Sequence, residues 1–403
     1  MPNFKYRGKN IKGETLKGKL EAGSEKEAIL LLRRQNIYPI EIKKESIANK
    51  EISFSIFQKV KIKDLAVFCR QFHAILDAGI SVLESLDILR NQTENKKLRD
   101  AIDDIYEEVQ KGKSLSSAMA NYKSIFPEIL INMIETGEVS GQLDVVLERM
   151  AVHFEKENKI NQKIQGAMVY PAIISIVALL VVWFLMTFVL PNFVDMFKGF
   201  GITLPLPTRI LLGTGKWLKN YWYILFAIIV ALIYIFRKYS NTEKGRYRID
   251  KLKLKLPVIG KVSGKIATSR FARTLSTLLA SGISIIEAME IVIRIIGNSV
   301  ISEGIHKSMD NIKKGLGIAE PLKELGIFPP MLISMIRIGE ESGSLDSMLA
   351  KTADFYDEEV ESAVAKMTTL IEPLIIVILA FVVGAIVVSI VLPMFEMFNQ
   401  IGV

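Results

Sequence analysis

The sequence Gly-Glu-Val-Ser-Gly-Gln-Leu-Asp occupies residues 137–144, and a close copy, Gly-Glu-Glu-Ser-Gly-Ser-Leu-Asp, occupies residues 339–346. A displacement of about 200 positions holds across roughly 125 residues, which indicates an internal duplication and not a chance motif. Further identical pairs at this or the neighbouring displacement are Phe68 with Phe271, Arg70 with Arg273, Gly79 with Gly282, Glu84 with Glu287, and Pro171 with Pro373.

The composition is that of a membrane protein. Half of the 403 residues are hydrophobic and the mean hydropathy is +0.31, so membrane spans are expected. The single cysteine, Cys69, excludes an internal disulfide framework and a cysteine-built metal site. Much of the net charge of +8 lies beside apolar runs, which argues against a nucleic-acid partner. No apolar h-region follows Met1, so we expect no cleavable signal peptide.

Two kinds of cytoplasmic domain are predicted. Residues 1–42 alternate, turn and then show helical spacing, which predicts a small α+β unit, followed by a linker over 43–60. Residues 61–168 and 263–371 each have helical periodicity with short connections and predict two bundles of about six helices. Gly79 and Gly282 are expected to end a helix in both copies.

Three membrane spans are predicted. Two of them are copies of each other, at 170–190 and 372–392, and each contains 19 consecutive uncharged residues. Each also has a proline, Pro171 or Pro373, where the helix enters the membrane. Pro171 should kink its helix there. Two parallel copies need one return span between them, and 217–236 supplies it. The fold class is therefore a mostly α, polytopic membrane protein.

Charge predicts the orientation of these spans. Eight basic residues against two acids follow the return span, so 237–262 is a basic cytoplasmic linker by the positive-inside rule. The loop 191–216 and the tail 393–403 are then extracytoplasmic, and the N-terminus is cytoplasmic. A stripe of small residues on the last span (Ala380, Gly384 and Ser389 among them) suits either a dimer seam or packing within one chain.

No catalytic or cofactor site is predicted. Gly260-Lys261-Val262-Ser263-Gly264-Lys265-Ile266 resembles a phosphate loop, but three residues separate its glycines where four are needed. Cys69 and His73 have a spacing that suits metal ligands, but their copies are Ala272 and Ser276. We therefore expect neither an enzyme nor a resident metal.

The octapeptides have two interpretations. In the first, the glycines shape a turn between helices and the last acid favours the start of the next helix, which makes Gly137, Gly141, Gly339 and Gly343 structural. In the second, their acids dock a basic partner, or bind a divalent cation weakly. The docking candidates are Glu138, Asp144, Glu340 and Asp346, together with the basic Lys251, Lys253 and Lys255.

Three features together resemble the type II secretion system F family. They are the Phe-x-Arg-x-x-x-x-x-Leu-x-x-Gly-Ile-Ser core (68–81 and 271–284), the Gly-Glu-x-Ser-Gly-x-Leu-Asp turns, and Tyr170-Pro171. The second copy departs from the pattern, with Glu372 in place of Tyr170.

This resemblance implies an inner-membrane platform protein of type IV pilus or type II secretion machinery. The implied partners are a cytoplasmic hexameric ATPase, pilin or pseudopilin subunits, other inner-membrane components and a second copy of the chain. The implied role is to couple the ATPase to the incorporation of subunits into a filament. The alternatives are a polytopic transporter, which normally needs polar groups in its spans, and a membrane-anchored sensor or enzyme.

Overall fold

The computed structural model describes residues 3–10, 15–22, 25–34, 37–44, 59–199 and 205–401. They fall into two units, which are described separately. In the N-terminal unit, three antiparallel strands in the order β2-β1-β3 accompany one helix, with Ala22, Ala28 and Leu31 in contact. Its elements are β1 (Asn3–Asn10), β2 (Thr15–Glu21), α1 (Glu25–Arg34) and β3 (Ile37–Lys44). Most of the linker predicted over 43–60 lies outside the described residues.

The second unit contains the two helical bundles, and each has the six helices that the repeats predict. The first comprises α2 (Ile62–Asp77), α3 (Val82–Gln92), α4 (Lys96–Gln110), α5 (Leu115–Met119), α6 (Glu128–Ser140) and the start of α7 (Leu143–Phe184). The second comprises α11 (Ile259–Ala280), α12 (Ile285–Ile295), α13 (Ser299–Lys313), α14 (Ala319–Glu324), α15 (Pro330–Ser342) and the start of α16 (Leu345–Ile401).

Equivalent sequence signals begin equivalent helices in the two bundles. The hydroxyl of Ser81 accepts a hydrogen bond from the Glu84 N–H (3.3 Å), and Ser284 accepts one from Glu287 (3.4 Å). Each serine thereby satisfies one of the N–H groups that a helix start leaves unpaired.

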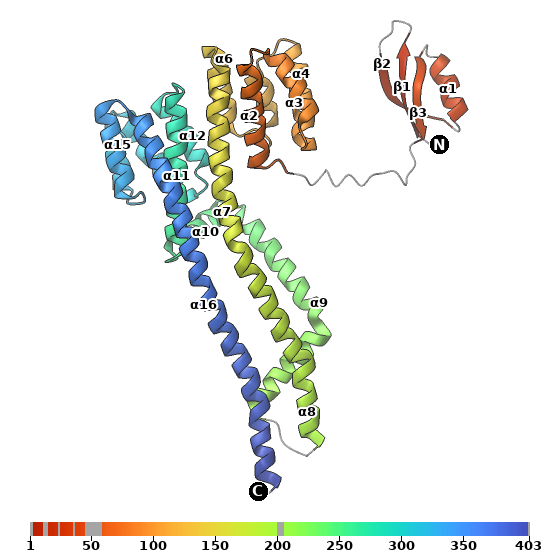
Figure 1. The fold of residues 1–403 in the computed structure, drawn as a ribbon, viewed down its shortest axis with the longest axis vertical. Helices are drawn as coiled ribbons and strands as arrows, with labels where there is room; N and C mark the ends of the chain where they lie inside the picture. Colours follow the sequence, from red (N-terminus) through yellow and green to blue (C-terminus); the bar gives the residue numbers. More distant parts are fainter. Residues whose placement is uncertain are drawn as a thin grey trace. The chain divides into compact units, whose positions relative to one another are not determined.

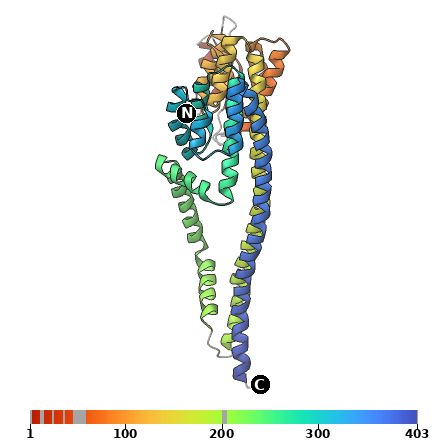
Figure 2. The same ribbon diagram turned by 90° about the vertical axis from the view of Figure 1, so that its left-hand side faces the viewer.

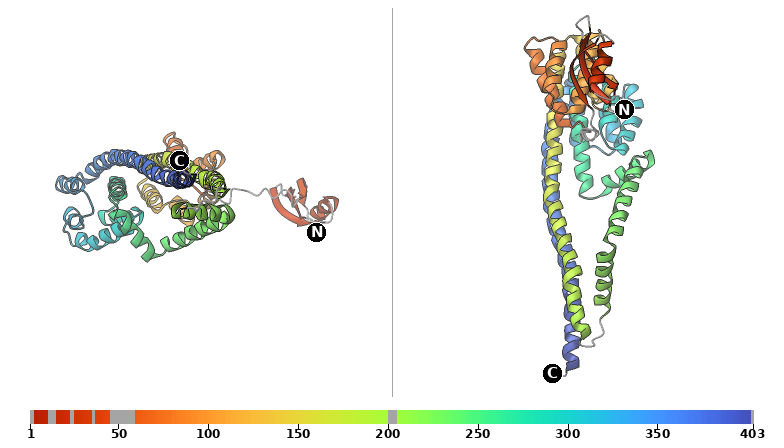
Figure 3. Two further views of the ribbon diagram at one scale, coloured as in Figure 1. Left: turned by 90° about the horizontal axis from the view of Figure 1, so that it is seen from below. Right: turned by 90° about the vertical axis from the view of Figure 1, so that its right-hand side faces the viewer.

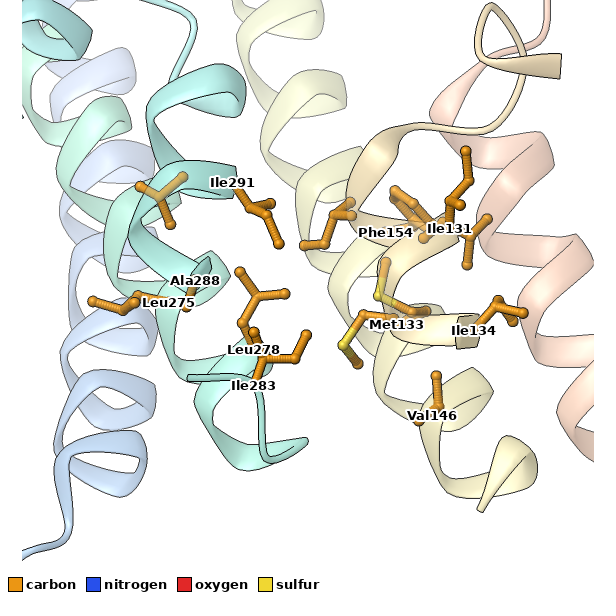
Figure 4. Packing of buried hydrophobic residues seen from close by; sticks show 14 of the residues in the cluster. Ile131, Met133, Ile134, Val146, Phe154, Leu275, Leu278, Ile283, Ala288 and Ile291 are labelled. Carbon is orange, nitrogen blue, oxygen red and sulfur yellow. The ribbon is translucent and has the colours of Figure 1, made fainter. Parts of the chain in front are cut away.

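One hydrophobic core runs through both bundles. Buried residues of the first bundle, such as Met133 and Phe154, belong to the same cluster as Leu278 and Ile291 of the second. Figure 4 shows these two sets of side chains coming from helices of the two bundles. Burial of this apolar surface is the main term that holds the bundles together.

Three helices are long and apolar enough to cross a membrane. α7 continues through a π-helical turn (Leu185–Val189) into α8 (Leu190–Gly199), and α16 runs beside α7 (Figures 1 and 2). Between them in sequence, α9 (Leu206–Ser240) contacts the π-helical turn and α16, and leads to α10 (Glu243–Lys255). Figure 3 shows α9 standing apart from the α7–α16 pair over much of its length.

Helices continue past several of the predicted boundaries, because a helix does not end where its apolar run ends. The loop predicted over 191–216 is helical in α8 and again from Leu206. The linker predicted over 237–262 holds the end of α9, all of α10 and the start of α11, and the tail predicted over 393–403 continues α16 to Ile401.

α7 runs through Pro171 as one helix, and a π-helical turn follows it at Leu185–Val189. A proline cannot bond the carbonyl four residues before it. That carbonyl, of Ala167, accepts a long hydrogen bond from the hydroxyl of Thr368 on α16 (3.5 Å).

Candidate functional site

The octapeptides form the turns between α6 and α7 and between α15 and α16. Gly141 ends α6 in the left-handed conformation, with φ of 70°, and Gly343 ends α15 with φ of 68°. This region of φ favours glycine because other residues carry a Cβ that clashes there. Both long helices that enter the membrane therefore start from the same glycine-dependent turn.

The first glycine of each octapeptide allows a close approach of the chain to itself. A Cβ on Gly137 would lie 3.1 Å from the Cα of Leu143, and one on Gly339 would lie 2.7 Å from the Cα of Leu345. At Gly339 a Cβ could be added only if the backbone moved, whereas at Gly137 the neighbouring atoms would have to give by a few tenths of an ångström. The absence of a side chain at both positions lets the next helix fold back closely onto the previous one.

The glutamates of the octapeptides bond to backbone within their own bundle. Both carboxylate oxygens of Glu138 accept hydrogen bonds at the start of α5, from the N–H groups of Leu115 (2.5 Å) and Ser116 (3.0 Å). Glu340 accepts equivalent bonds from Ile318 and Ala319 at the start of α14. The helix N-terminus favours a negative charge, so the two glutamates fasten α5 to α6 and α14 to α15.

The aspartates of the octapeptides lie at the start of the long helices, and their backbone carbonyls contact the first helix of each bundle. His73 Nδ1 lies 3.0 Å from the Asp144 carbonyl oxygen, and Ser276 donates to the Asp346 carbonyl oxygen at 2.8 Å. His73 and Ser276 are equivalent positions, so two different side chains make the same structural contact. No set of three His, Cys, Asp or Glu side chains that could hold a metal is found in the described residues.

One duplicated ion pair escaped the sequence analysis. Arg70 makes a two-pronged pair with Glu155 (2.9 and 2.8 Å), and its copy Arg273 pairs with Asp357 (2.6 Å), the copy of Glu155. The second pair is largely buried, with 13% and 14% of the side chains exposed. The signal was available, since a basic and an acidic residue recur at both equivalent positions.

Polar contacts join the two bundles beside the shared core. Arg149 of α7 donates to the carbonyl of Ala280 and to the hydroxyl of Ser281 (2.9 Å) on α11. Lys156 of α7 pairs with Asp354 of α16 (3.0 Å). The bundles are therefore coupled by direct contacts as well as through their spans.

A buried polar cluster lies at this junction, where His153, Glu157, Arg270 and Arg273 line a cavity of about 20 Å³. Burial, together with the two arginines, lowers the pKa of His153 to about 4. Its Nδ1 has no hydrogen-bond partner within the described part of the chain. Burial raises the pKa of Glu157, although Arg270 lies 3.4 Å away and opposes the shift. The cavity has room for one water molecule.

The long helices α7 and α16 also meet at equivalent positions near the membrane. The hydroxyl of Tyr170 donates to the carboxylate of Glu372 at 3.2 Å, and these residues occupy the same place in the two repeats. Contact between two equivalent positions is the arrangement that a two-fold axis between the repeats would produce. The departure of Glu372 from the repeat pattern therefore provides an acceptor for Tyr170.

Family comparison covers both repeats and the N-terminal unit. The model of "Type II secretion system (T2SS), protein F" matches residues 68–191 and again residues 271–393, and that of its N-terminal domain matches residues 1–43. The chain belongs to the type II secretion system F family.

Members of the F family align with the chain over nearly its full length. It is 39% identical to the type IV pilus assembly protein PilC of Thermus thermophilus, with all of both chains covered. It is 36% identical to PilC of Pseudomonas aeruginosa, over 92% of this chain and 98% of that one. It is 31% identical to type II secretion system protein F of Vibrio cholerae, over 99% of both.

The basic docking candidates of this F-family chain lie on α10. Lys251 and Lys255 are exposed, and Lys253 pairs with Asp250 (3.3 Å), which also accepts hydrogen bonds at the start of α13 from Ser299. Gly79 and Gly282 have positive φ just beyond the ends of α2 and α11.

On the last span, Ser389 is buried, and its carbonyl accepts a hydrogen bond from the Thr208 hydroxyl of α9 (2.6 Å). This end of the small-residue stripe therefore packs within the chain. Ala380 and Ala385 of the same stripe are exposed.

Proposed function

We propose that this protein is an inner-membrane platform of a type IV pilus assembly or type II secretion machine. The observation that carries the proposal is the family match to both repeats, since each repeat consists of one helical bundle and one span. The full-length relatives named for pilus assembly and for type II secretion support it.

Deletion of the gene tests the proposal. The deletion strain should lose surface filaments, secreted proteins or both. A plasmid that carries the wild-type gene should restore what is lost. Loss of filaments alone would assign the chain to pilus assembly, and loss of secretion alone to type II secretion. Normal filaments and normal secretion, with no second copy of the gene, would contradict the platform role.

Both bundles are proposed to lie in the cytoplasm and the C-terminus outside it. The support is the charge beyond α9, where basic residues dominate α10. Cysteines placed at exposed Asn192 and Asn241, at opposite ends of the membrane region, would test this orientation in a Cys69→Ala background. A membrane-impermeant maleimide should label the Asn192→Cys protein in intact cells but not the Asn241→Cys protein. The reverse pattern would invert the topology.

The cytoplasmic ATPase is proposed to dock at the bundle ends that carry the two octapeptide turns. Both carboxylate oxygens of Glu138 and of Glu340 accept hydrogen bonds from the chain's own backbone. Asp144 and Asp346 are therefore the better acidic candidates for contact with the ATPase. Beside them Val139 is 86% exposed, an unusual place for a large apolar residue. Its copy is Glu341, so the fold accepts a glutamate at this position.

The substitution Val139→Glu therefore tests docking with little risk to folding. Less ATPase should co-purify with the full-length Val139→Glu protein than with wild type. Glu341→Gln, at the equivalent position of the second turn, is the matched change. Equal recovery of the ATPase with Val139→Glu and with wild type would remove Val139 from the proposed surface. Pilin or pseudopilin incorporation is the proposed outcome of this coupling.

A further inference from the structure

A second feature lies where the second bundle meets the membrane region. A cavity of about 790 Å³ is formed by the turn between α10 and α11, by α11 itself and by α16. Among the described residues, its lining contains no acidic side chain and four basic ones, which are Lys255, Lys261, Lys265 and Lys366.

Most of this positive charge is uncompensated. Lys265 pairs with Glu359 of α16 and lowers the pKa of its carboxylate. The charge of Lys366 adds a smaller lowering of the same pKa. Lys255, Lys261 and Lys366 are exposed and make no ion pair with any described residue. A cavity that gathers lysines without matching acids is suited to an anion.

The phosphate-loop-like stretch contributes two of these lysines, but not as a loop. It lies inside α11, where the N–H of Gly260 donates to Leu256 (2.8 Å) and that of Val262 donates to Val258 (3.3 Å). Amides engaged in this way cannot wrap around a nucleotide. The helix nevertheless places Lys261 and Lys265 one turn apart on the same face.

The rest of the lining is apolar and leads toward the membrane. Leu370 lines the cavity, is 60% exposed, and precedes the apolar run that begins at Leu374 by about 6 Å along the helix. This is the depth of the headgroup layer at one side of a bilayer. The other apolar lining residues include Leu254, Leu256, Pro257, Val258 and Met367.

We propose that this cavity binds the phosphate of an anionic phospholipid, whose acyl chains lie along the exposed apolar side of α16. The lysines bind the phosphate, and Met367 and Leu370 contact the glycerol and the first methylenes. The site belongs to the second repeat alone, because the equivalents of Lys265 and Lys366 are Ile62 and Ile164. The bound lipid fastens the α10–α11 turn to the bilayer surface.

Lipid retention by the full-length protein tests the site. The protein is purified from nanodiscs of equal parts phosphatidylcholine and phosphatidylglycerol, and the phosphatidylglycerol it retains is counted by native mass spectrometry. A membrane-surface lysine contributes roughly fivefold in affinity, so the triple variant Lys255→Gln, Lys261→Gln, Lys366→Gln should bind phosphatidylglycerol on the order of a hundredfold more weakly. The matched control neutralises Lys238, Lys244 and Lys251, which lie outside the cavity lining, and should retain the lipid.

A second variant leaves every lysine in place. Gly264 lines the cavity and a Cβ there would meet no atom within 4 Å, so Gly264→Leu should fill the space and also displace the lipid. Equal retention by wild type and both variants would overturn the proposal. The protein in pure phosphatidylcholine gives a second test, in which its stability against thermal unfolding is measured with each ligand. If inorganic phosphate or an acidic peptide stabilised it as much as phosphatidylglycerol does, the ligand would not be a lipid, and the proposal would also be overturned.

Discussion

At the scale of single residues, the octapeptide glutamates act within the fold. Glu138 and Glu340 each satisfy two N–H groups of a short helix 22 or so positions earlier in the chain. The sequence shows that these acids recur, but it does not show which helix start lies opposite them. Their role depends on the angle between α5 and α6, which only the folded structure supplies.

We predict that Glu138→Ala lowers the free energy of unfolding by about 1–3 kcal/mol, because two backbone donors lose a charged partner. Thermal unfolding of the detergent-solubilised full chain measures the change. Glu135→Ala is the control, since Glu135 is exposed one turn earlier on α6. Equal unfolding temperatures for the two variants would show that the contact contributes nothing.

Buried His153 should make the protein sensitive to acid. Its pKa falls from the ordinary 6.5 to about 4 on folding, so the unfolded chain binds a proton more readily. The stability that comes from a neutral His153 is present above pH 6.5 and is lost as the pH falls toward 4, by up to about 3 kcal/mol. Glu157 has a raised pKa and acts in the opposite direction.

The difference between wild type and His153→Gln isolates the histidine, because Glu157 is present in both. Unfolding temperatures between pH 7 and pH 4 should fall less steeply for His153→Gln. Exposed His306→Gln is the control and should follow wild type. Parallel curves for all three proteins would mean that His153 is not held neutral.

At the scale of helices and turns, the close approach at the two octapeptides differs in tightness. There is less free space at Gly339 than at Gly137. A Cβ added at Gly339 would lie 2.7 Å from the Cα of the following leucine, and one added at Gly137 would lie 3.1 Å from it. Backbone atoms cannot move aside as a flexible side chain can. The second turn should therefore tolerate substitution less than the first.

We predict that Gly339→Ala destabilises the protein by about 1–3 kcal/mol through overpacking, and that Gly137→Ala costs less. Gly166→Ala is the matched control, because Gly166 is exposed within α7 and has open space around it. That change should stabilise the helix by about 0.5–1 kcal/mol. A reversed order of the two turn variants would contradict the packing argument.

Helix identity was easier to predict from the sequence than helix length. Periodicity predicted about six helices in each bundle, and the serine caps at Ser81 and Ser284 marked the starts of α3 and α12, because these signals are local. The helices extend past the predicted spans, since hydropathy reports where a helix is apolar and not where its hydrogen bonds stop. The extensions of α8, α9 and α16 beyond their apolar runs carry polar residues that hydropathy assigns to loops.

At the scale of the whole second unit, duplication predicted the architecture but not the contacts between copies. Internal alignment pairs equivalent residues, yet it does not say which of them touch. Arg149 with Ser281 and Lys156 with Asp354 join non-equivalent positions, so no comparison of the repeats could reveal them. Tyr170 with Glu372 joins equivalent ones, as a two-fold axis between the repeats would.

We predict that cysteines at positions 170 and 372 can be joined within one chain by a short bismaleimide. With a protease site inserted after Gly199, cleavage should leave the two halves linked on a denaturing gel. Cysteines at the equivalent pair Ala172 and Leu374 lie about 200° further around each helix and should link far less. Equal linking of both pairs, or separated halves in both, would place the axis elsewhere.

The contact between Tyr170 and Glu372 also bears on how such a chain could arise. A homodimer of a single repeat must present the same side chain from both subunits at its symmetry axis, so a glutamate there would face a glutamate and a tyrosine a tyrosine. Fusion of two repeats into one gene removes that constraint. Each on-axis position can then mutate alone, and a pair of identical neighbours becomes a donor and an acceptor. The asymmetry of this one hydrogen bond is thus a form of chemistry that a symmetric ancestor could not have used.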